Sequence, residues 1–395
     1  VISICLYILL WICAPAISRF FSESLLIPVI RVLGLVLIIN SCSIIQRTVL
    51  VRNIDFKTQT KVSLIASLVS GGVGITMALY HCGVWSLVGQ QLSRQFFNSV
   101  LLWIYGKWRP LWEFSYKSFK DLFGFGSKLL LSGLIDVFYK NVYYIVIGRY
   151  YSATQLGQYT RAEQFSTIFS SNLTSVFQRV SYPVLSSIQE EPERLREPYR
   201  KIIKVTMLIT FALMFGLAAI AKPLIVILIG EKWLMAVPFL QIICFSEMLY
   251  PLHAINLNIL QVRGYSGLFL KLEIVKKIIA VIPIMIGIFW GINYMLWGAV
   301  CISLVSYILN SYYSGRLIDY STVKQVKDIF PCFLVSSLVA LLMWGITFLH
   351  FNFLVTLLLQ VSVGILLAIV AYERMRLEEY KEIRRIILSI IRKNS

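Results

Sequence analysis

Long apolar runs recur from one end of this 395-residue chain to the other, and they constrain its fold more than any other feature. Twenty apolar residues in a helix rise about 30 Å, which matches the hydrocarbon core of a bilayer. Only 14% of the residues are charged, against about 25% in a soluble globular protein. The sequence therefore predicts an all-α polytopic membrane protein, and it excludes a soluble enzyme, a disordered chain and a disulfide scaffold.

Twelve runs are predicted as membrane spans: 1–18, 25–46, 62–80, 84–105, 129–149, 156–188, 203–221, 234–260, 272–290, 294–314, 329–349 and 353–372. Basic residues concentrate in alternate connections, around 47–61, 107–128, 194–204, 263–277, 316–327 and 374–393. The opposite connections carry only Arg19, Arg149, Lys222 and Lys232. By the positive-inside rule, the basic connections and the C-terminus are cytoplasmic. Topology thus explains the net charge of +18, and no nucleic acid is expected as a partner.

A faint internal repeat predicts two lobes. Segments 61–93 and 271–306 both pair a helix that starts at a lysine with a glycine turn and a second helix, at an offset of six predicted spans. We expect a shortened N-lobe of about four helices at 1–120, a six-helix C-lobe at 121–321, and an extra helix pair with a basic tail at 322–395. Two such lobes and the pair make fourteen helices, so two spans are expected to precede Val1.

Ionisable side chains within the predicted spans are the candidates for function, because each is costly in lipid. The cations are Arg31, Arg94, Lys140, Arg161 and Arg179, and the carboxylates are Asp136, Glu163 and Glu247. A surplus of cations suits an anionic substrate such as a diphosphate-linked molecule, and the Tyr and Trp faces suit sugar rings.

Each of these side chains also has a structural explanation that the sequence leaves open. Asp136 and Lys140 lie at i and i+4, so they can neutralise one another. Arg31 and Arg161 lie near span ends and can reach the interface. Glu247 can be a protonated carboxylate in the core, whereas Arg94 lies on the same helix face as Gln90, Gln91 and Asn98.

Cysteines and histidines give no sign of a catalytic or metal site. The seven cysteines lie almost wholly within apolar runs, where they are expected to act as small hydrophobic residues. The three histidines are scattered, and no Walker A motif is present. We expect no catalytic residue, no metal and no cofactor other than a coupling ion.

Three stretches in order carry a family resemblance: IGRYYSATQLGQYTRA (147–162), VSYPVLSSIQEEPERLREPYR (180–200) and GEKWLMAVPFLQI (230–242). With 51–62 and 108–126 they resemble the polysaccharide-exporter branch of the multidrug/oligosaccharidyl-lipid/polysaccharide (MOP) superfamily, which contains the O-antigen, colanic acid and capsule flippases. The resemblance covers essentially the entire chain. It implies a fourteen-helix, two-lobe bundle like that of the multidrug (MATE) exporters, of which about twelve helices are here, with a cationic cavity and alternating access.

The resemblance also implies a function. An undecaprenyl-pyrophosphate-linked oligosaccharide would move from the cytoplasmic to the periplasmic leaflet of the bacterial inner membrane, with membrane lipids and the polymerase and glycosyltransferases of the pathway as partners. The candidates for binding the pyrophosphate and sugar are Lys140, Arg94, Arg161 and Arg31. The candidates for binding H⁺ or Na⁺ are Asp136, Glu163 and Glu247.

Three alternatives remain. A cation-coupled multidrug exporter shares this architecture, but it would favour a cavity rich in carboxylates. A polysaccharide polymerase or ligase would carry a long periplasmic loop, whereas the longest outer connections here are about a dozen residues. A non-transporting scaffold of a polysaccharide assembly complex is the third. The sequence favours a transporter over an enzyme.

Overall fold

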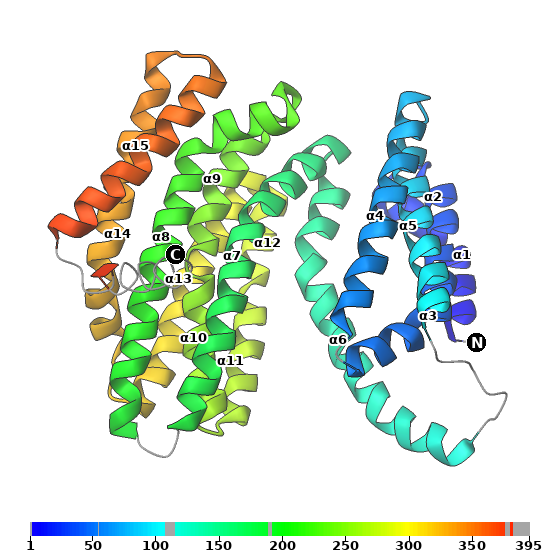
Figure 1. Cartoon of the computed structure of the whole chain (residues 1–395), viewed down its shortest axis with the longest axis horizontal. Helices are drawn as coiled ribbons and strands as arrows, with labels where there is room; N and C mark the ends of the chain where they lie inside the picture. The colour runs from blue at the N-terminus through cyan, green and yellow to red at the C-terminus, as the bar shows by residue number, and fades with distance from the viewer. Residues whose placement is uncertain (1, 54, 107–114, 189–191, 376–379, 382–395) are drawn as a thin grey trace. The chain divides into compact units, whose positions relative to one another are not determined.

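The computed structural model describes residues 2–53, 55–106, 115–188, 192–375 and 380–381 (Figure 1). These residues form helices joined by short connections, and no β-strand occurs among them. The chain divides into two compact units, Val1–Leu134 and Ile135–Ser395.

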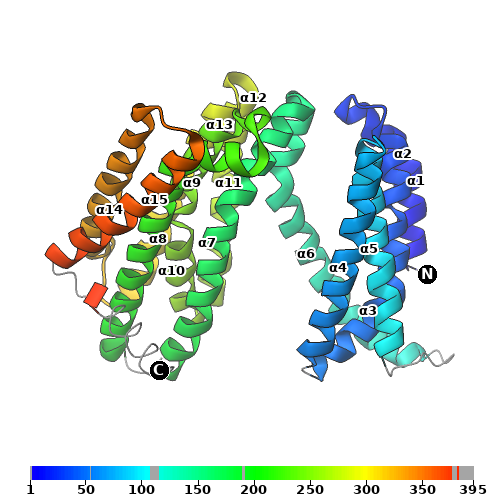
Figure 2. The ribbon, with the colours of Figure 1, turned by 45° about the horizontal axis from the view of Figure 1, so that its top comes forward.

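The first unit contains five helices and the beginning of a sixth (Figure 2). They are α1 (Ile2–Phe21), α2 (Leu26–Leu33), α3 (Leu35–Arg52), α4 (Phe56–Leu79), α5 (Val84–Tyr105) and the first part of α6 (Tyr116–Tyr150). α5 packs along both α3 and α4. Trp103 on α5 donates a hydrogen bond from Nε1 to the carbonyl oxygen of Cys42 on α3, at 2.8 Å. These three helices therefore form the centre of the unit.

The second unit continues α6 and contains the remaining helices. They are α7 (Ala153–Ser187), α8 (Pro192–Ile229), η1 (Glu231–Trp233), α9 (Ala236–Glu247), α10 (Tyr250–Val262), α11 (Ser266–Ile279), α12 (Val281–Trp290), α13 (Ile292–Leu317), α14 (Thr322–Gly345), η2 (Ile346–Leu349) and α15 (Phe353–Arg374). α7, α8, α9, α10 and α13 pack against one another, and both α14 and α15 pack on α8.

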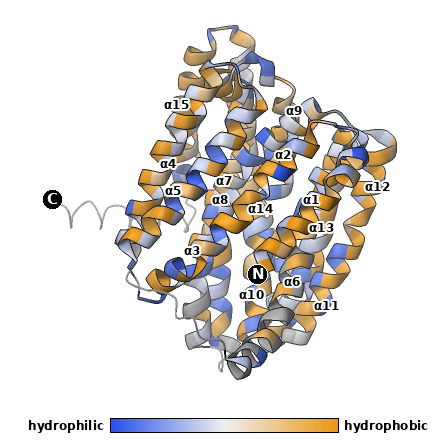
Figure 3. Ribbon diagram, turned by 90° about the vertical axis from the view of Figure 1, so that its right-hand side faces the viewer, coloured by the Kyte–Doolittle hydropathy of each residue, from blue (hydrophilic) through white to orange (hydrophobic). Residues whose placement is uncertain are grey.

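Each predicted span lies on one helix or on a pair of consecutive helices. Seven helical segments among the described residues are long and apolar enough to cross a membrane. Exposed and buried side chains also fit a lipid environment: Ile12 and Leu68 are 69% and 68% exposed, whereas Asn310 and Gln360 are fully buried. Apolar residues follow the helices of both units (Figure 3). The chain is thus an all-α, multi-pass membrane protein.

Polar side chains begin several of these helices. Asp55 accepts a hydrogen bond from the backbone N–H of Thr58 at 3.0 Å and caps α4. This bond, together with one from the Thr58 hydroxyl, lowers the pKa of Asp55. Ser152 caps α7 in a capping box with Gln155. The chain therefore encodes these helix starts locally, at the boundaries between spans.

Two glycines lie at breaks between helices. Gly34 separates α2 from α3, and a Cβ there would lie 2.9 Å from the ring of Tyr7 on α1. Gly291 separates α12 from α13 with a φ of 113°, a conformation that favours glycine. The second predicted span is accordingly two helices rather than one.

An ion pair holds α14 against α8. Arg200 on α8 donates two hydrogen bonds to the carboxylate of Asp328 on α14, at 2.6 and 2.8 Å. Tyr320 donates a third to the same carboxylate at 2.6 Å. Close by, Asn256 on α10 accepts from Tyr199 at 2.9 Å and from Gln325 at 3.3 Å. We call Arg200, Asp328 and Tyr320 the α8–α14 clasp.

Several helix limits differ from the predicted spans. α6 begins at Tyr116 rather than at 129, so part of the basic connection predicted around 107–128 is helical and continues directly into the span. α11 begins at Ser266 rather than at 272, which places Lys276 about 15 Å along the helix axis. Lys276 and Lys277 therefore lie on a helix, as the predicted span 272–290 implies, although their charges were counted with the basic connection at 263–277. The expected domain boundaries at 120 and 321 remain predictions.

Candidate functional site

A polar face on α5 carries the arginine that the sequence singled out. The polar residues of the face are Gln91, Arg94, Gln95 and Asn98, and Leu102 continues it by one turn. Their spacing of i, i+3, i+4, i+7 and i+11 places all five on one side of a helix. A polar face is costly on a helix that contacts lipid, so it indicates a contact with protein or water.

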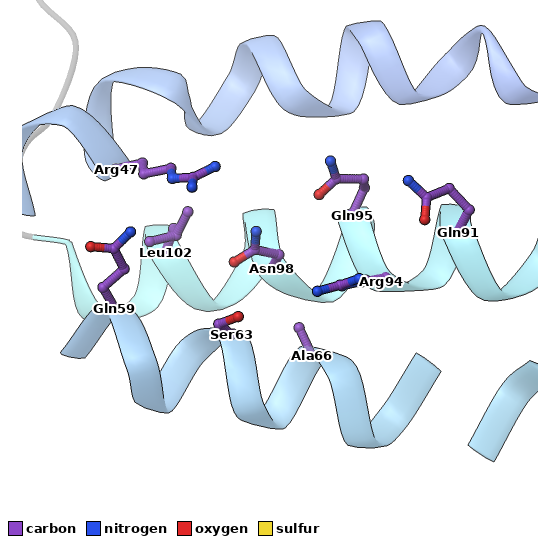
Figure 4. A pocket seen from close by; sticks show the side chains of 9 residues that line it. All are labelled: Arg47, Gln59, Ser63, Ala66, Gln91, Arg94, Gln95, Asn98 and Leu102. Carbon is purple, nitrogen blue, oxygen red and sulfur yellow. The ribbon is translucent and has the colours of Figure 1, made fainter. Parts of the chain in front are cut away.

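This face lines a cavity of about 220 Å³ within the first unit (Figure 4). α4 contributes Gln59, Ser63 and Ala66, and α3 contributes Arg47. The side chains of all three helices converge on the space between them. None of the described lining residues is acidic. Two guanidinium groups and four side-chain amides therefore surround a space that suits an anion. We call it the Arg94 cavity.

Arg94 thus lies on a polar face, as the sequence predicts. Gln91 and Asn98 line the cavity with it, whereas Gln90 lies against α4, where a Cβ on Gly74 would be 3.1 Å from its Cβ. Arg47 was assigned to a cytoplasmic connection because it follows an apolar run. Its position in the last turns of α3, beside α5, brings it to the cavity instead.

Arg31 and Arg161 each lie over an indole ring. The guanidinium carbon of Arg31, on α2, is 4.5 Å from the ring centroid of Trp11. That of Arg161, on α7, is 5.4 Å from the ring centroid of Trp233. Arg161 also donates to Gln164 at 2.9 Å. Arg31 is not among the residues that line the Arg94 cavity, so the structure does not bring Arg31 and Arg94 together there.

Glu163 and Glu247 lie in one region of the second unit. Tyr144 on α6 donates a hydrogen bond to Glu163 on α7. Ser170, two turns further along α7, donates to Glu247 on α9 at 2.6 Å. α7 and α9 pack against each other, so the two carboxylates lie on neighbouring helices.

Tyrosines complete the surroundings of this carboxylate pair. The ring of Tyr159 stacks on Tyr143 at 6.5 Å and meets Tyr144 edge-on at 5.6 Å. Within the described part of the chain, neither Glu163 nor Glu247 forms an ion pair with a cation. Hydroxyl groups are thus their hydrogen-bonding partners, an arrangement that can hold a proton.

Asp136 and Lys140 lie on α6, where their spacing places them one turn apart on the same face. Their side chains are outside the described residues. Among the side chains that are described, no three His, Cys, Asp or Glu residues gather as metal ligands would.

A second cavity, of about 430 Å³, lies within the second unit among α6, α7, α10, α11 and α13. One face of α10 and one face of α11 form most of its wall. Its polar lining includes Gln178, His253, Asn258, Gln261, Glu273, Lys276 and Lys277. We call it the Lys277 cavity. The sequence signal that could have found it is the polar spacing on α10, where His253, Asn258 and Gln261 share one helix face.

Known proteins resemble this chain in sequence. The family described as polysaccharide biosynthesis protein matches residues 1–238, more than half of the chain. The teichuronic acid biosynthesis protein TuaB of Bacillus subtilis (strain 168) is 24% identical over 367 residues, which cover 92% of this chain and 76% of TuaB. The succinoglycan biosynthesis transport protein ExoT of Rhizobium meliloti (strain 1021) is 24% identical over 218 residues, which cover 55% of this chain and 44% of ExoT.

A solved structure has the same fold. The lipid II flippase MurJ, in its inward closed conformation, superposes with a TM-score of 0.73 at 14% sequence identity. The match covers 95% of this chain and 82% of MurJ. It therefore extends over nearly all the helices described above.

Proposed function

This chain belongs to the polysaccharide biosynthesis protein family, and we propose that it is a flippase for lipid-linked oligosaccharides. An undecaprenyl-pyrophosphate-linked repeat unit would move from the cytoplasmic to the periplasmic leaflet of the bacterial inner membrane, for the assembly of a surface polysaccharide. Similarity to proteins named for the biosynthesis of teichuronic acid and the transport of succinoglycan supports this proposal. The fold of a lipid II flippase is consistent with it.

The observation that carries the proposal is the Arg94 cavity. Arg47 and Arg94 form no ion pair with another described residue. A cation held between membrane helices without a counter-charge is costly, and an anionic substrate offsets that cost. Guanidinium groups form paired, charge-assisted hydrogen bonds with phosphate oxygens. In this proposal Arg94 and Arg47 bind the pyrophosphate, and the glutamine and asparagine amides bind its remaining oxygens.

The other cations have subsidiary roles in the proposal. Arg161 beside Trp233 and Arg31 over Trp11 each combine a positive charge with an aromatic face, which suits a sugar next to a phosphate. Lys140, on α6, remains a candidate for attracting the pyrophosphate.

Ion coupling is assigned to the carboxylates. Glu163 and Glu247 would bind H⁺ or Na⁺ and so favour one of two lobe arrangements, with Asp136 as a further candidate. The hydroxyl partners Tyr144 and Ser170 support this role, because they stabilise a carboxyl group in either protonation state. Alternating access would then move the substrate without a covalent step, so the protein would be a transporter and not an enzyme.

A multidrug exporter is the second candidate of the same fold. Such a protein binds cationic drugs and would be expected to place carboxylates in its substrate cavity. The described residues that line the Arg94 cavity include none, which favours the flippase.

Complementation tests the proposal. A strain that lacks this gene in its native host should accumulate lipid-linked repeat units and lose its surface polymer. The intact protein should reverse both effects. A double variant, Arg47→Gln with Arg94→Gln, should export at least about tenfold less polymer, because charge-assisted hydrogen bonds to the pyrophosphate are lost.

The control is Arg19→Gln, which removes an exposed arginine of the first unit that does not line the cavity. It should export normally at equal membrane abundance. Normal export by the double variant would show that the Arg94 cavity is not needed for binding the substrate. If the unaltered protein fails to clear the accumulated repeat units, the proposal that it is a flippase is contradicted.

A further inference from the structure

The polar side chains that line the Arg94 cavity have no hydrogen-bonding partners among the described residues. They present two guanidinium groups, four amides and the hydroxyl of Ser63, and none of these groups bonds to another described residue. Elsewhere on α5, Ser99 and Trp103 donate to carbonyl oxygens of α3, at 3.4 and 2.8 Å. Because a polar group between membrane helices is costly without a partner, the cavity lining fits a ligand that completes its bonds.

A diphosphate can satisfy only part of this lining. Its oxygens accept hydrogen bonds from the guanidinium groups and from the amide N–H groups. Each amide also has a carbonyl oxygen, which can only accept, and a diphosphate diester has no hydrogen to donate to it. Hydroxyl groups of a sugar do donate. The lining of the cavity therefore fits an occupant that carries donor groups beside its anionic group.

The dimensions of the cavity agree with such an occupant. Its lining on α5 runs from Gln91 to Leu102, which is about 16 Å along the helix axis and longer than a diphosphate group. Its volume of about 220 Å³ is below the roughly 300–1,000 Å³ typical of pockets that enclose a whole ligand. The cavity thus suits a diphosphate with one attached sugar better than an entire repeat unit.

Asn98 is the amide beside the guanidinium group of Arg94. The two residues lie at i and i+4 on α5, and the Arg94 side chain extends along the helix towards Asn98 (Figure 4). In a glycosyl diphosphate, C2 is bonded to the carbon that carries the phosphate, so its substituent is the ring donor nearest to the phosphate. A phosphate bound by Arg94 therefore brings that donor to the side of Asn98.

We propose that the Arg94 cavity binds the diphosphate and its attached sugar as one unit, and that Asn98 accepts a hydrogen bond from the group at C2 of this sugar. Arg47 and Arg94 bind the phosphate oxygens, and the amide oxygens of Gln91 and Gln95 are available to other ring hydroxyls. Substrates whose first sugar carries a hydroxyl or acetamido group at C2 are thereby preferred over those without a donor there. This selectivity in transport rests on the proposed function, whereas binding of the sugar can be tested separately.

Calorimetric titration of the intact protein in lipid nanodiscs tests this inference with three soluble probes. They are citronellyl diphosphate, its glucosyl derivative, and the 2-deoxy-2-fluoro form of that derivative, in which fluorine replaces the C2 hydroxyl and cannot donate. We expect the glucosyl probe to bind about two- to tenfold more tightly than the fluoro form, the range that one net hydrogen bond contributes. This comparison needs no variant.

Three variants assign the preference to a residue. Asn98→Leu has a similar size but no amide, so it should abolish the preference for the C2 hydroxyl. Arg47→Gln removes a contact to the diphosphate alone, so it should weaken the binding of all three probes by a similar factor and retain the preference. The matched control is Asn40→Leu, the same substitution at an exposed position of α3 outside the cavity, which should change neither the affinities nor the preference.

The outcomes separate this inference from the proposed function. Equal affinities of the unaltered protein for the two glucosyl probes would overturn the inference and leave binding of the diphosphate standing. A preference that survives in Asn98→Leu would overturn it as well. If none of the probes binds, both the inference and the proposed function are contradicted. A clear preference in a protein that fails complementation would instead support the sugar site and contradict the flippase.

Discussion

Glu247 is the residue at which ion coupling can be tested most directly. It lies at the C-terminal end of α9, accepts a hydrogen bond from Ser170, and forms no ion pair with a described cation. Glu247→Gln keeps the shape and the hydrogen bond but removes titration. If proton binding drives transport, export should fall at least about tenfold, which corresponds to roughly 1.4 kcal/mol, and should no longer respond to an imposed proton gradient.

The matched control is Glu231→Gln, in the exposed turn after α8. It should respond to the gradient as the unaltered protein does. Export by Glu247→Gln that still rises with the gradient would show that this carboxyl group does not couple.

At the same scale, individual candidates could be predicted where the signal is local. Arg94 shares an α5 face with Gln91 and Asn98, and that spacing is visible in the sequence. Arg47 and Lys277 could not be found in this way, because an average of hydropathy over a window treats a cation near an apolar run as a flanking residue. Their cavities form only when α3 meets α5 and α10 meets α11.

Among the helices, the α8–α14 clasp should contribute measurably to stability. The Asp328 side chain is 15% exposed and accepts hydrogen bonds from Arg200 and Tyr320. Asp328→Asn removes the carboxylate to which both Arg200 and Tyr320 donate and leaves Arg200 only its longer pair with Glu197 at 3.9 Å, so the free energy of unfolding should fall by about 2 kcal/mol. Thermal unfolding in detergent would show this as a lower Tm.

Asp319→Asn is the comparison, with the same chemical change at an exposed ion pair. Asp319 is 84% exposed and lies 3.4 Å from Arg196. Its loss should cost at most about 0.5 kcal/mol, because solvent screens such pairs. Asparagine also tolerates the φ of 49° at this position. Equal losses in the two variants would contradict a stabilising role for the clasp.

The elements themselves could be predicted almost throughout, since an apolar run of about 20 residues is a property of the local sequence. What could not be predicted is their subdivision. The break between α2 and α3 lies at Gly34, which packs closely against Tyr7, a residue of another helix. The limits of α6 and α11 likewise extend beyond the apolar runs, because tertiary packing continues a helix through polar turns.

For the whole molecule, the charge distribution predicts an orientation that labelling can test. The ammonium group of Lys222, near the end of α8, is 5.9 Å from the ring centroid of Phe353 at the start of α15, so these two ends share one side of the unit. In a variant without the native cysteines, Lys232→Cys should react with an impermeant maleimide in intact cells. Arg374→Cys, at the far end of α15, should react only after the membrane is permeabilised.

The opposite pattern would reverse the orientation, and with it the direction of transport. The family and the fold class could be predicted from the sequence because they depend on the order of spans and motifs. The cavities were not, because they depend on neighbours that lie far apart in the chain.

The clasp also has a consequence for the surrounding lipid. Since the clasp joins α14 to α8 and α15 packs on both, any rotation of that bundle carries two additional helices through the acyl chains. A wider moving perimeter displaces more lipid for each degree of rotation. The free-energy cost of each such rotation therefore depends on the thickness and fluidity of the bilayer, and it increases with the perimeter that these two helices add.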